Sequence, residues 1–229
     1  MEQVIDQKKL LVADRVTFAY KTRHQTVWAV RDVSYEFEAG KVYAIVGKSG
    51  CGKTTLISTL AGLNLPSMGD VYYRGTSTYQ MNRNHYRRDD VAVIYQNYNL
   101  FPLLTVLENV LYPMELQKRP KKEAVAIAKE TLRSVGLDES YFKRLPAMLS
   151  GGEQQRVAIA RAIASGQRVI LADEPTGNLD GENSDLVMKT FQRLAHEVGY
   201  CIIIVTHDPQ IADESDVIIR MDSGRIVKK

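Results

Sequence analysis

The chain has little of three features that would each assign it to a particular class of protein. Its 229 residues include only two cysteines, Cys51 and Cys201, too few for a disulfide framework and typical of a reducing compartment. No run approaches the ~18 apolar residues that a membrane-spanning helix needs. The opening stretch MEQVIDQKKL also lacks the apolar segment of a signal peptide. We therefore expect a cytoplasmic protein with no membrane span of its own.

A strong excess of charge of one sign is also absent. The chain has 30 basic and 27 acidic residues, for a net charge of +3. This balance implies no field of the kind that nucleic-acid-binding proteins carry, so no nucleic acid partner is expected. With 45% hydrophobic and 25% charged residues, the composition is that of an ordinary globular chain. Its length is sufficient to bury a core within one domain.

Short apolar runs alternate with helical patterns along most of the sequence. Four runs are almost wholly apolar: VYAIV (42–46), VAVIY (91–95), VILA (169–172) and CIIIV (201–205). Such runs are typical of strands that are buried on both faces of a parallel sheet covered by helices. Earlier stretches alternate as half-buried strands do, and the chain ends in a predicted hairpin that turns at 222–224. The predicted fold is α/β, with a mainly parallel sheet, an antiparallel β part and a mainly helical insertion around 97–150.

The sequence GKSGCGKTT directly follows the first of these apolar runs. It matches the pattern G-x-x-x-x-G-K-[ST] of a phosphate-binding loop, with Lys53 and Thr54 at the last two positions. Such a loop aims backbone amides at a triphosphate, and the N-terminus of the following helix adds a favourable dipole. Lys53 is expected to reach the β- and γ-phosphates, and Thr54 to bind Mg²⁺. The predicted ATP-binding residues of the loop are Gly47, Lys48, Ser49, Gly50, Cys51, Gly52, Lys53, Thr54 and Thr55.

The other apolar runs also lead into polar residues. VILA continues into Asp173 and Glu174, VAVIY into Gln96, and CIIIVT into His207. Because the carboxyl ends of parallel strands share one edge, these side chains should meet near Lys53. Asp173 is expected to hold the magnesium shell and Glu174 to polarise the attacking water. A lone histidine or a lone Asp-Glu pair is more often structural, so the coincidence at one edge carries the prediction.

Two other features depend on what approaches them. Tyr20 follows the first strand and either stacks on a purine ring or packs into the protein; the sequence leaves both open. Further on, Ser150 and Glu153 have the spacing of a capping box at the start of a helix. Yet Gly151 and Gly152 occupy its first turn, although a glycine costs roughly 1 kcal/mol relative to alanine in a helix interior. The glycines indicate that something must come very close to this helix end.

Together these motifs resemble the ATP-binding subunits of ABC transporters, over essentially the whole chain. They occur in that family's order: A-loop Tyr20, Walker A GKSGCGKT, Q-loop Gln96, signature LSGGEQQ, Walker B VILADE, D-loop NLD (178–180) and switch His207. The residues of these motifs are similar to those of the branch that contains LolD, MacB, FtsE and BceA. Lys48 and Cys51 stand where that family usually has proline or arginine and serine, and neither departure removes a catalytic group.

The resemblance implies a single ABC ATP-binding domain over 1–229, built on a P-loop NTPase core. The core with its antiparallel β subdomain would span about 1–96 and 165–229, and a helical subdomain about 97–164. The resemblance also implies a homodimer that forms on ATP binding. Each ATP would lie between the Walker A loop of one copy and the signature residues Ser150, Gly151 and Gly152 of the other.

The family's roles can then be carried over to matching residues. The implied catalytic residues are Glu174 as general base, His207 at the γ-phosphate, Lys53 and Gln96. The implied Mg²⁺ ligands are Thr54, Gln96 and Asp173. Asp180 would communicate across the dimer. These assignments predict an ATPase that uses ATP and Mg²⁺.

A subunit of this kind without a membrane span implies a separate membrane permease. The permease is expected to contact the apolar stretch NYNLFPLLTVLENVLYP (97–113), which would hold the subunit at the inner face of the cell membrane. The expected function is ATP-driven movement of that permease, for export, for extraction of lipoproteins or antimicrobial peptides, or for efflux. One alternative is the ATPase of a mechanotransmission or sensing complex of the same branch that carries no cargo. A remoter alternative is a soluble ABC ATPase that acts on nucleic acid.

Overall fold

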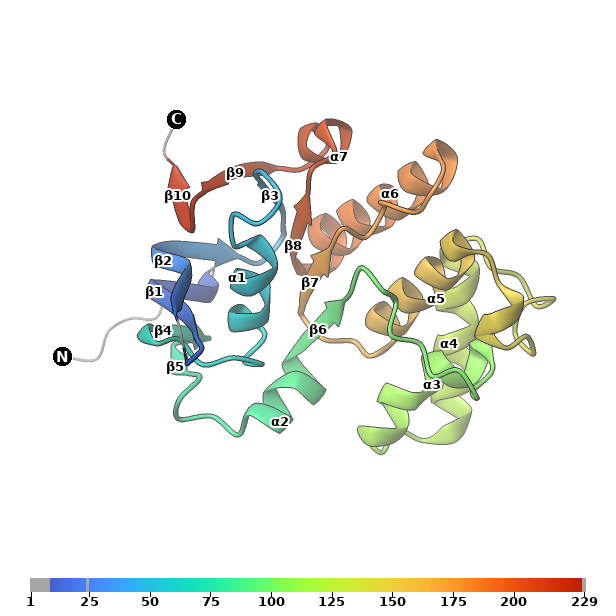
Figure 1. Cartoon of the computed structure of the whole chain (residues 1–229). Helices are drawn as coiled ribbons and strands as arrows, with labels where there is room; N and C mark the ends of the chain where they lie inside the picture. Colours follow the sequence, from blue (N-terminus) through green and yellow to red (C-terminus); the bar gives the residue numbers. More distant parts are fainter. Residues whose placement is uncertain (1–8, 24, 228–229) are drawn as a thin grey trace.

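The structure is a computed structural model that describes residues 9–23 and 25–227, so residues 1–8, 24 and 228–229 of the predicted domain lie outside the described residues. Two sheets form its framework (Figure 1). The antiparallel sheet has the order β2-β1-β4-β5. Its strands are β1 (Lys9–Lys21), β2 (Thr26–Glu38), β4 (Met68–Tyr73) and β5 (Thr76–Ser77).

The second sheet has six strands in the order β10-β9-β3-β8-β7-β6. They are β3 (Lys41–Val46), β6 (Val91–Ile94), β7 (Val169–Asp173), β8 (Cys201–Thr206), β9 (Val217–Asp222) and β10 (Arg225–Val227). All neighbouring strands pair in parallel except β10, which pairs antiparallel with β9 as a C-terminal hairpin. The predicted α/β class, mainly parallel sheet and antiparallel part are confirmed.

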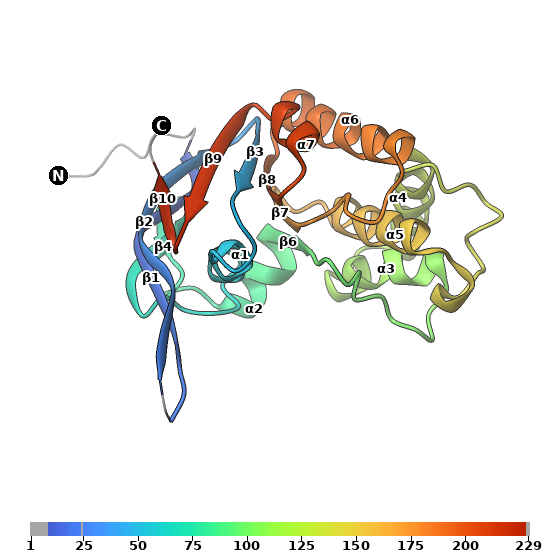
Figure 2. The ribbon, with the colours of Figure 1, turned by 45° about the horizontal axis from the view of Figure 1, so that its top comes forward.

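Helices pack against these sheets and between them (Figure 2). They are α1 (Lys53–Leu60), α2 (Arg83–His85), α3 (Val106–Leu116), α4 (Lys121–Ser134), α5 (Gly151–Ala164), α6 (Gly181–Val198) and α7 (Pro209–Asp213). A π-helical turn (Tyr86–Asp90) follows α2, and a 3₁₀ turn (Pro146–Met148) precedes α5. Helix α1 contacts both sheets, whereas α3, α4 and α5 pack on one another at the far side.

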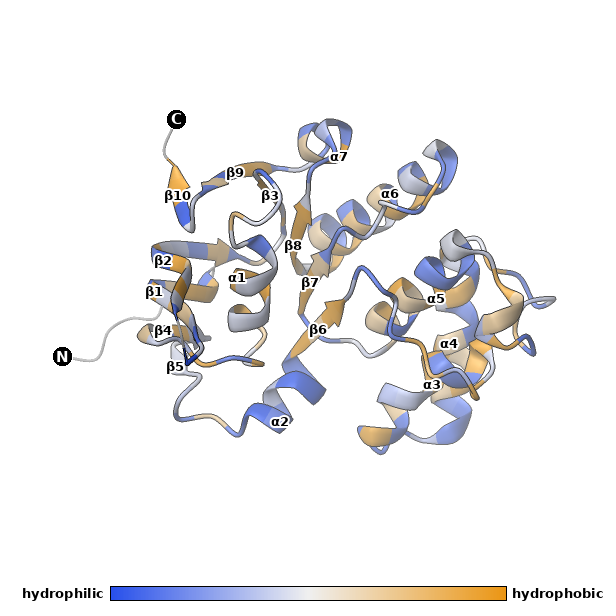
Figure 3. Cartoon of the chain, viewed as in Figure 1, coloured by the Kyte–Doolittle hydropathy of each residue, from blue (hydrophilic) through white to orange (hydrophobic). Residues whose placement is uncertain are grey.

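The six-stranded sheet separates two hydrophobic cores, because successive side chains of a strand point to opposite faces. On β8, Ile202 and Ile204 belong to the core that contains α3 to α6, whereas Ile203 and Val205 belong to the core that contains α1 and the antiparallel sheet. Both faces are therefore apolar, and β6, β7 and β8 are hydrophobic along their lengths (Figure 3). This explains the unbroken apolar runs in the sequence.

The helices between 97 and 164 form their own layer, although their core is continuous with one face of the sheet. The subdomain boundaries at 97 and 164 remain a prediction. None of the helices in the described ranges is both long and apolar enough to cross a membrane.

Candidate functional site

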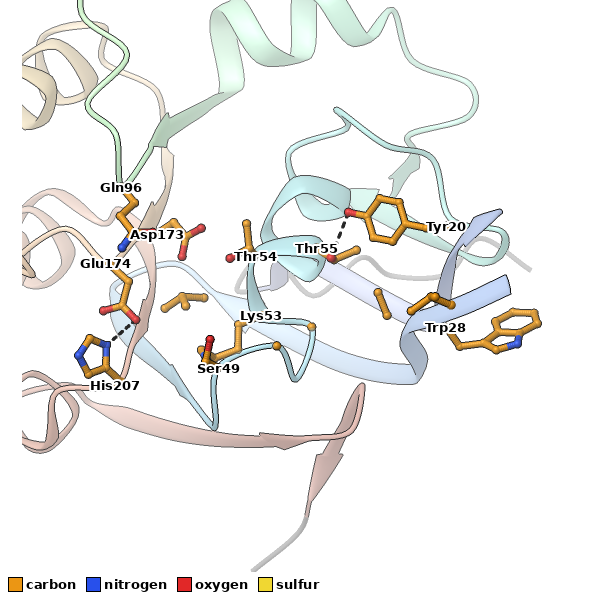
Figure 4. A pocket seen from close by; sticks show the side chains of 15 residues that line it. Tyr20, Trp28, Ser49, Lys53, Thr54, Thr55, Gln96, Asp173, Glu174 and His207 are labelled. Atoms are coloured by element: carbon orange, nitrogen blue, oxygen red, sulfur yellow. Dashed lines mark hydrogen bonds and ion pairs between the residues drawn. The ribbon is translucent and has the colours of Figure 1, made fainter. Parts of the chain in front are cut away.

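A cavity of ≈ 610 Å³ opens at the carboxyl edge of the parallel sheet (Figure 4). Strands β3, β6, β7 and β8 all end at this edge, and residues at or just after the end of each strand line the cavity. The side chains that sequence reasoning placed at one edge are brought together there: Lys53, Thr54, Gln96, Asp173, Glu174 and His207. Ser49, Gly50, Gly52 and Thr55 of the phosphate loop also line it, whereas Gly47, Lys48 and Cys51 do not.

Lys53 is the first residue of α1, and its side chain reaches back to the start of the phosphate loop. Its side chain is buried, and its Nζ donates hydrogen bonds to the carbonyl oxygens of Gly47 at 2.7 Å and Lys48 at 3.1 Å. Gly52, which precedes α1, has φ 104°, and a Cβ there would lie 2.0 Å from the carbonyl oxygen of Ala29. Glycine is therefore required both for the backbone conformation and for the close packing of β2.

The N-terminus of α1 is prepared for an anion. No side chain of the described residues caps it, and its first turn carries no acidic residue. The first amides of a helix have no partner within the helix, and the helix dipole favours negative charge beside them. The loop and helix therefore offer bare backbone donors, together with the Lys53 ammonium, to a phosphate group.

The oxygen donors opposite the loop fit a magnesium ion that is shared with phosphates. Asp173 is 8% exposed, and this burial raises the pKa of its carboxyl group, against the opposing effects of the Thr54 hydrogen bond and the Lys53 charge. The described residues contain no cluster of three or more His, Cys, Asp or Glu side chains that could hold a metal by themselves. Mg²⁺ commonly binds through one or two carboxylates plus substrate phosphates, which suits Asp173 with the Thr54 hydroxyl and the Gln96 amide.

Glu174 and His207 form a pair at one end of the cavity (Figure 4). The Nδ1 atom of His207 lies 2.8 Å from Oε1 of Glu174, and this hydrogen bond raises the pKa of His207. Glu174 has φ 50°, a left-handed conformation that non-glycine residues rarely adopt, and its N–H donates to the carbonyl of Val205 at 2.9 Å. The fold thus holds this carboxylate in a strained backbone position at the end of β7, as is common in active sites.

Tyr20 lines the other end of the cavity. It is 48% exposed, its hydroxyl lies 3.2 Å from Oγ1 of Thr55, and its ring packs edge-on against Phe18. The exposure leaves ring surface available for stacking, so the structure favours that reading over a fully packed tyrosine. Sequence reasoning missed Val27, Trp28 and Ala29, which also line the cavity. They were missed because only the β1–β2 pairing, which places Val27 opposite Tyr20, brings them there.

Ser150, Gly151 and Gly152 do not line the cavity. The predicted capping box is present: the Ser150 hydroxyl accepts from the Glu153 N–H at 3.3 Å, and Glu153 accepts from the Ser150 N–H at 2.7 Å. The two glycines are already approached by their own chain. A Cβ at Gly151 would lie 3.0 Å from the Tyr98 hydroxyl, and one at Gly152 would lie 3.2 Å from the Asn178 carbonyl oxygen.

Asp180 also lies outside the cavity lining and has a local role in the single chain. It is the N-cap of α6, and its Oδ1 accepts from the Asn183 N–H at 2.9 Å. This backbone hydrogen bond is the main reason why the pKa of Asp180 is lowered.

Comparisons with known proteins bear directly on this arrangement. Residues 30–177 match the family model described as ABC transporter. The chain belongs to the ABC transporter family. It is 40% identical over 220 residues to the ABC transporter ATP-binding protein YclH of Bacillus subtilis (strain 168), covering 96% of each chain. It is 39% identical over 221 residues to the lipoprotein-releasing system ATP-binding protein LolD of Francisella tularensis subsp. holarctica (strain OSU18), covering 95% of each.

Solved structures agree with this assignment. The ABC transporter cassette MJ0796, described as bacterial and dimeric, matches with a TM-score of 0.91 and 35% identity over 96% of this chain and 97% of the other. The same cassette in a post-hydrolysis state bound to ADP and Pi matches with a TM-score of 0.91 and 34% identity over the same shares. This chain is therefore an ABC transporter ATP-binding subunit with the cassette fold.

Proposed function

We propose that this ABC ATP-binding subunit hydrolyses ATP in a dimer whose two active sites are each shared between two copies. One observation carries the proposal. The cavity gathers Lys53, Asp173 and Glu174, whereas Ser150 and Gly152 of the signature do not line it. Likeness to the MJ0796 cassette, which is dimeric and has a post-hydrolysis state bound to ADP and Pi, supports a dimer that hydrolyses ATP.

ATP binding begins at the phosphate loop. Lys53 exchanges the carbonyls of Gly47 and Lys48 for the β- and γ-phosphates, because an ammonium binds an anionic oxygen more strongly than a neutral carbonyl. The free amides at the start of α1 add further donors. Tyr20 stacks on the purine from the far end of the cavity.

Thr54, Asp173 and Gln96 would hold Mg²⁺, which when bound neutralises charge on the phosphate oxygens. For hydrolysis, Glu174 takes a proton from water as the water oxygen bonds to the γ-phosphorus and the bond to the ADP oxygen breaks. His207 turns from Glu174 to the γ-phosphate. The raised pKa of His207 belongs to its pairing with Glu174, and once the ring turns away its N–H can still donate to an anionic phosphate oxygen.

The partner copy closes the site with its signature helix. Ser150, Gly151 and Gly152 lie at the exposed N-terminus of α5, where the helix dipole favours a phosphate. Asp180 lies next to this region at the start of α6 and communicates across the dimer. Positioning by two rigid halves and dispersal of negative charge then supply most of the rate acceleration.

We further propose that ATP-driven closure moves a separate membrane permease bound at 97–113. Leu103 is 88% exposed and Phe101 is 39% exposed, with the Phe101 ring 4.5 Å from that of Tyr112. Such an apolar surface suits a helix from a partner. Likeness to LolD supports an export or extraction complex, with this subunit at the cytoplasmic face of the membrane.

The Glu174→Gln variant tests the shared site. We expect hydrolysis to fall by roughly 10²- to 10⁴-fold, because the general base is lost. Its ATP complex should persist as a dimer in size-exclusion chromatography with ATP and Mg²⁺, whereas the protein with ADP should elute as a monomer. Glu197→Gln, at an exposed position of α6, serves as the matched control. A Glu174→Gln protein that stays monomeric with ATP would contradict the shared site.

A further inference from the structure

Tyr98 follows Gln96 by two residues in the sequence, yet the structure fastens it to a different part of the molecule. Tyr98 has φ 60° and Asn99 has φ 47°. Left-handed conformations cost non-glycine residues on the order of 1–2 kcal/mol each. Two of them in succession persist only when neighbouring groups hold the backbone in place.

Arg161 of α5 holds this backbone. Its guanidinium donates to the carbonyl oxygen of Tyr98 at 2.9 Å and to that of Asn99 at 2.7 Å. Burial lowers the pKa of Arg161, and its hydrogen bond to Tyr98 is partly buried, whereas the one to Asn99 lies at the surface. The loop that begins at Gln96 is therefore attached to the signature helix (Figure 1).

The Tyr98 side chain then reaches the first turn of the same helix. A Cβ built on Gly151 would lie 3.0 Å from the Tyr98 hydroxyl oxygen and 4.0 Å from its Cζ. Arg161 lies ten residues beyond Gly151, about 15 Å along the helix axis. The Tyr98 side chain therefore extends from its backbone contact with Arg161 toward the N-terminus of the helix. Within the ranges 9–23 and 25–227, the hydroxyl forms no hydrogen bond with another residue.

We propose that the Tyr98 hydroxyl is part of the signature half of the shared site and donates a hydrogen bond to the phosphates of the ATP that the partner copy holds. This inference rests on the proposed function, because it requires a second copy to bring ATP to Ser150 and Gly151. A phenol O–H donates well to an anionic phosphate oxygen, and such a charge-assisted bond is stronger than a neutral one.

The Arg161 hydrogen bonds fix the backbone from which the Tyr98 side chain extends. They bind main-chain carbonyls, so moving this backbone away from Gly151 would break both of them. A donor held in advance loses little conformational entropy when the phosphate arrives. The strain at Tyr98 and Asn99 together with the Arg161 anchor indicates such preorganisation.

The test compares Tyr98→Phe with its parent in a Glu174→Gln background, where ATP dimers accumulate. The substitution removes one oxygen atom and keeps the ring. Loss of a hydrogen bond to a charged group weakens an interaction by about 10-fold or more. Because a dimer contains two such sites, the dimer dissociation constant should rise roughly 100-fold in analytical ultracentrifugation with ATP and Mg²⁺. Binding of a fluorescent ATP analogue by the monomer should stay unchanged.

Tyr72→Phe, on β4 of the antiparallel sheet, is the matched control and should leave both measurements unchanged. An unaltered dimer dissociation constant in Tyr98→Phe would overturn the inference, and a tighter dimer would show that the hydroxyl obstructs the site. Equal weakening of monomer binding would also overturn it, because Tyr98 would then act through Gln96 of its own chain. If the Glu174→Gln parent itself does not dimerise, the proposed function fails first.

Discussion

In the proposed dimer, the N-terminus of α1 in one copy and that of α5 in the other contact the same ATP, and the two helix ends differ in their capping. Helix α1 begins after Gly52, with no capping side chain from the described residues and no acid in its first turn. Helix α5 begins after Ser150, whose hydroxyl caps it, and carries Glu153 in its first turn. The first helix end has no side-chain cap, whereas at the second the capping box already pairs the N–H groups of Ser150 and Glu153.

This difference predicts the order in which ATP binds the two halves of the site, first at α1 and then at α5. A phosphate at α1 gains donors that no capping side chain occupies, so a single chain should bind ATP through its own loop. A phosphate at α5 finds the N–H groups of Ser150 and Glu153 already paired and approaches the Glu153 carboxylate, so the net gain there is smaller. Binding at the signature should therefore depend on a partner that delivers ATP already bound.

Among the variants that compare the two helix ends, the largest effect is expected for Lys53, which belongs to the α1 half of the site. We expect Lys53→Ala to weaken ATP binding by the monomer roughly 10- to 100-fold, because a hydrogen-bonded charge is removed from the phosphates. Titration with a fluorescent ATP analogue below the dimerisation range measures this. Lys122→Ala, at an exposed position of α4, controls for the loss of a positive charge. Near-normal affinity in Lys53→Ala would contradict the preformed half-site at α1.

An intermediate effect concerns the cap of α5. Ser150→Ala removes the hydroxyl that accepts from Glu153, so the free energy of unfolding should fall by about 1 kcal/mol in the nucleotide-free chain. Urea denaturation measures this change. The same variant should bind ATP normally as a monomer but form ATP dimers poorly in a Glu174→Gln background. Ser150→Thr keeps a capping hydroxyl and should restore stability. Weaker monomer binding would show that the two helix ends do not act separately.

The smallest expected effect is on the titration of His207. The Glu174 carboxylate raises the pKa of His207, so Glu174→Gln should lower it, as NMR titration of the imidazole would show. Because the pKa is raised in the folded chain, the pair stabilises the fold below roughly pH 6.5, the unfolded value. That stabilisation is lost as pH rises through the folded pKa. The effect is small, because the His207 side chain is 76% exposed. His85, on α2, is the control, and an unchanged His207 pKa would mean that the pair does not form in solution.

Local patterns were sufficient to predict most of the fold and the cavity. The apolar runs ended at the residues that line the cavity, because parallel strands deliver their carboxyl ends to one edge. Ser150 and Glu153 were predictable as a capping box because its interactions span only three residues. Trp28 and Ala29 were not predictable, because their position depends on the register between β1 and β2. Tyr98 gave no signal either, because its contacts with Arg161 and Gly151 join distant parts of the chain.

The residue types were sufficient to indicate which groups could bind and cleave a triphosphate, since the chemistry of Lys53, Asp173 and Glu174 follows from their identity. It also showed that Gly151 and Gly152 must admit a close neighbour. The neighbours of these glycines within one chain are set by long-range packing, which brings the Tyr98 hydroxyl to Gly151 and the Asn178 carbonyl and Leu179 side chain to Gly152. Local sequence could not indicate them, because glycine leaves the space open and distant parts of the chain fill it.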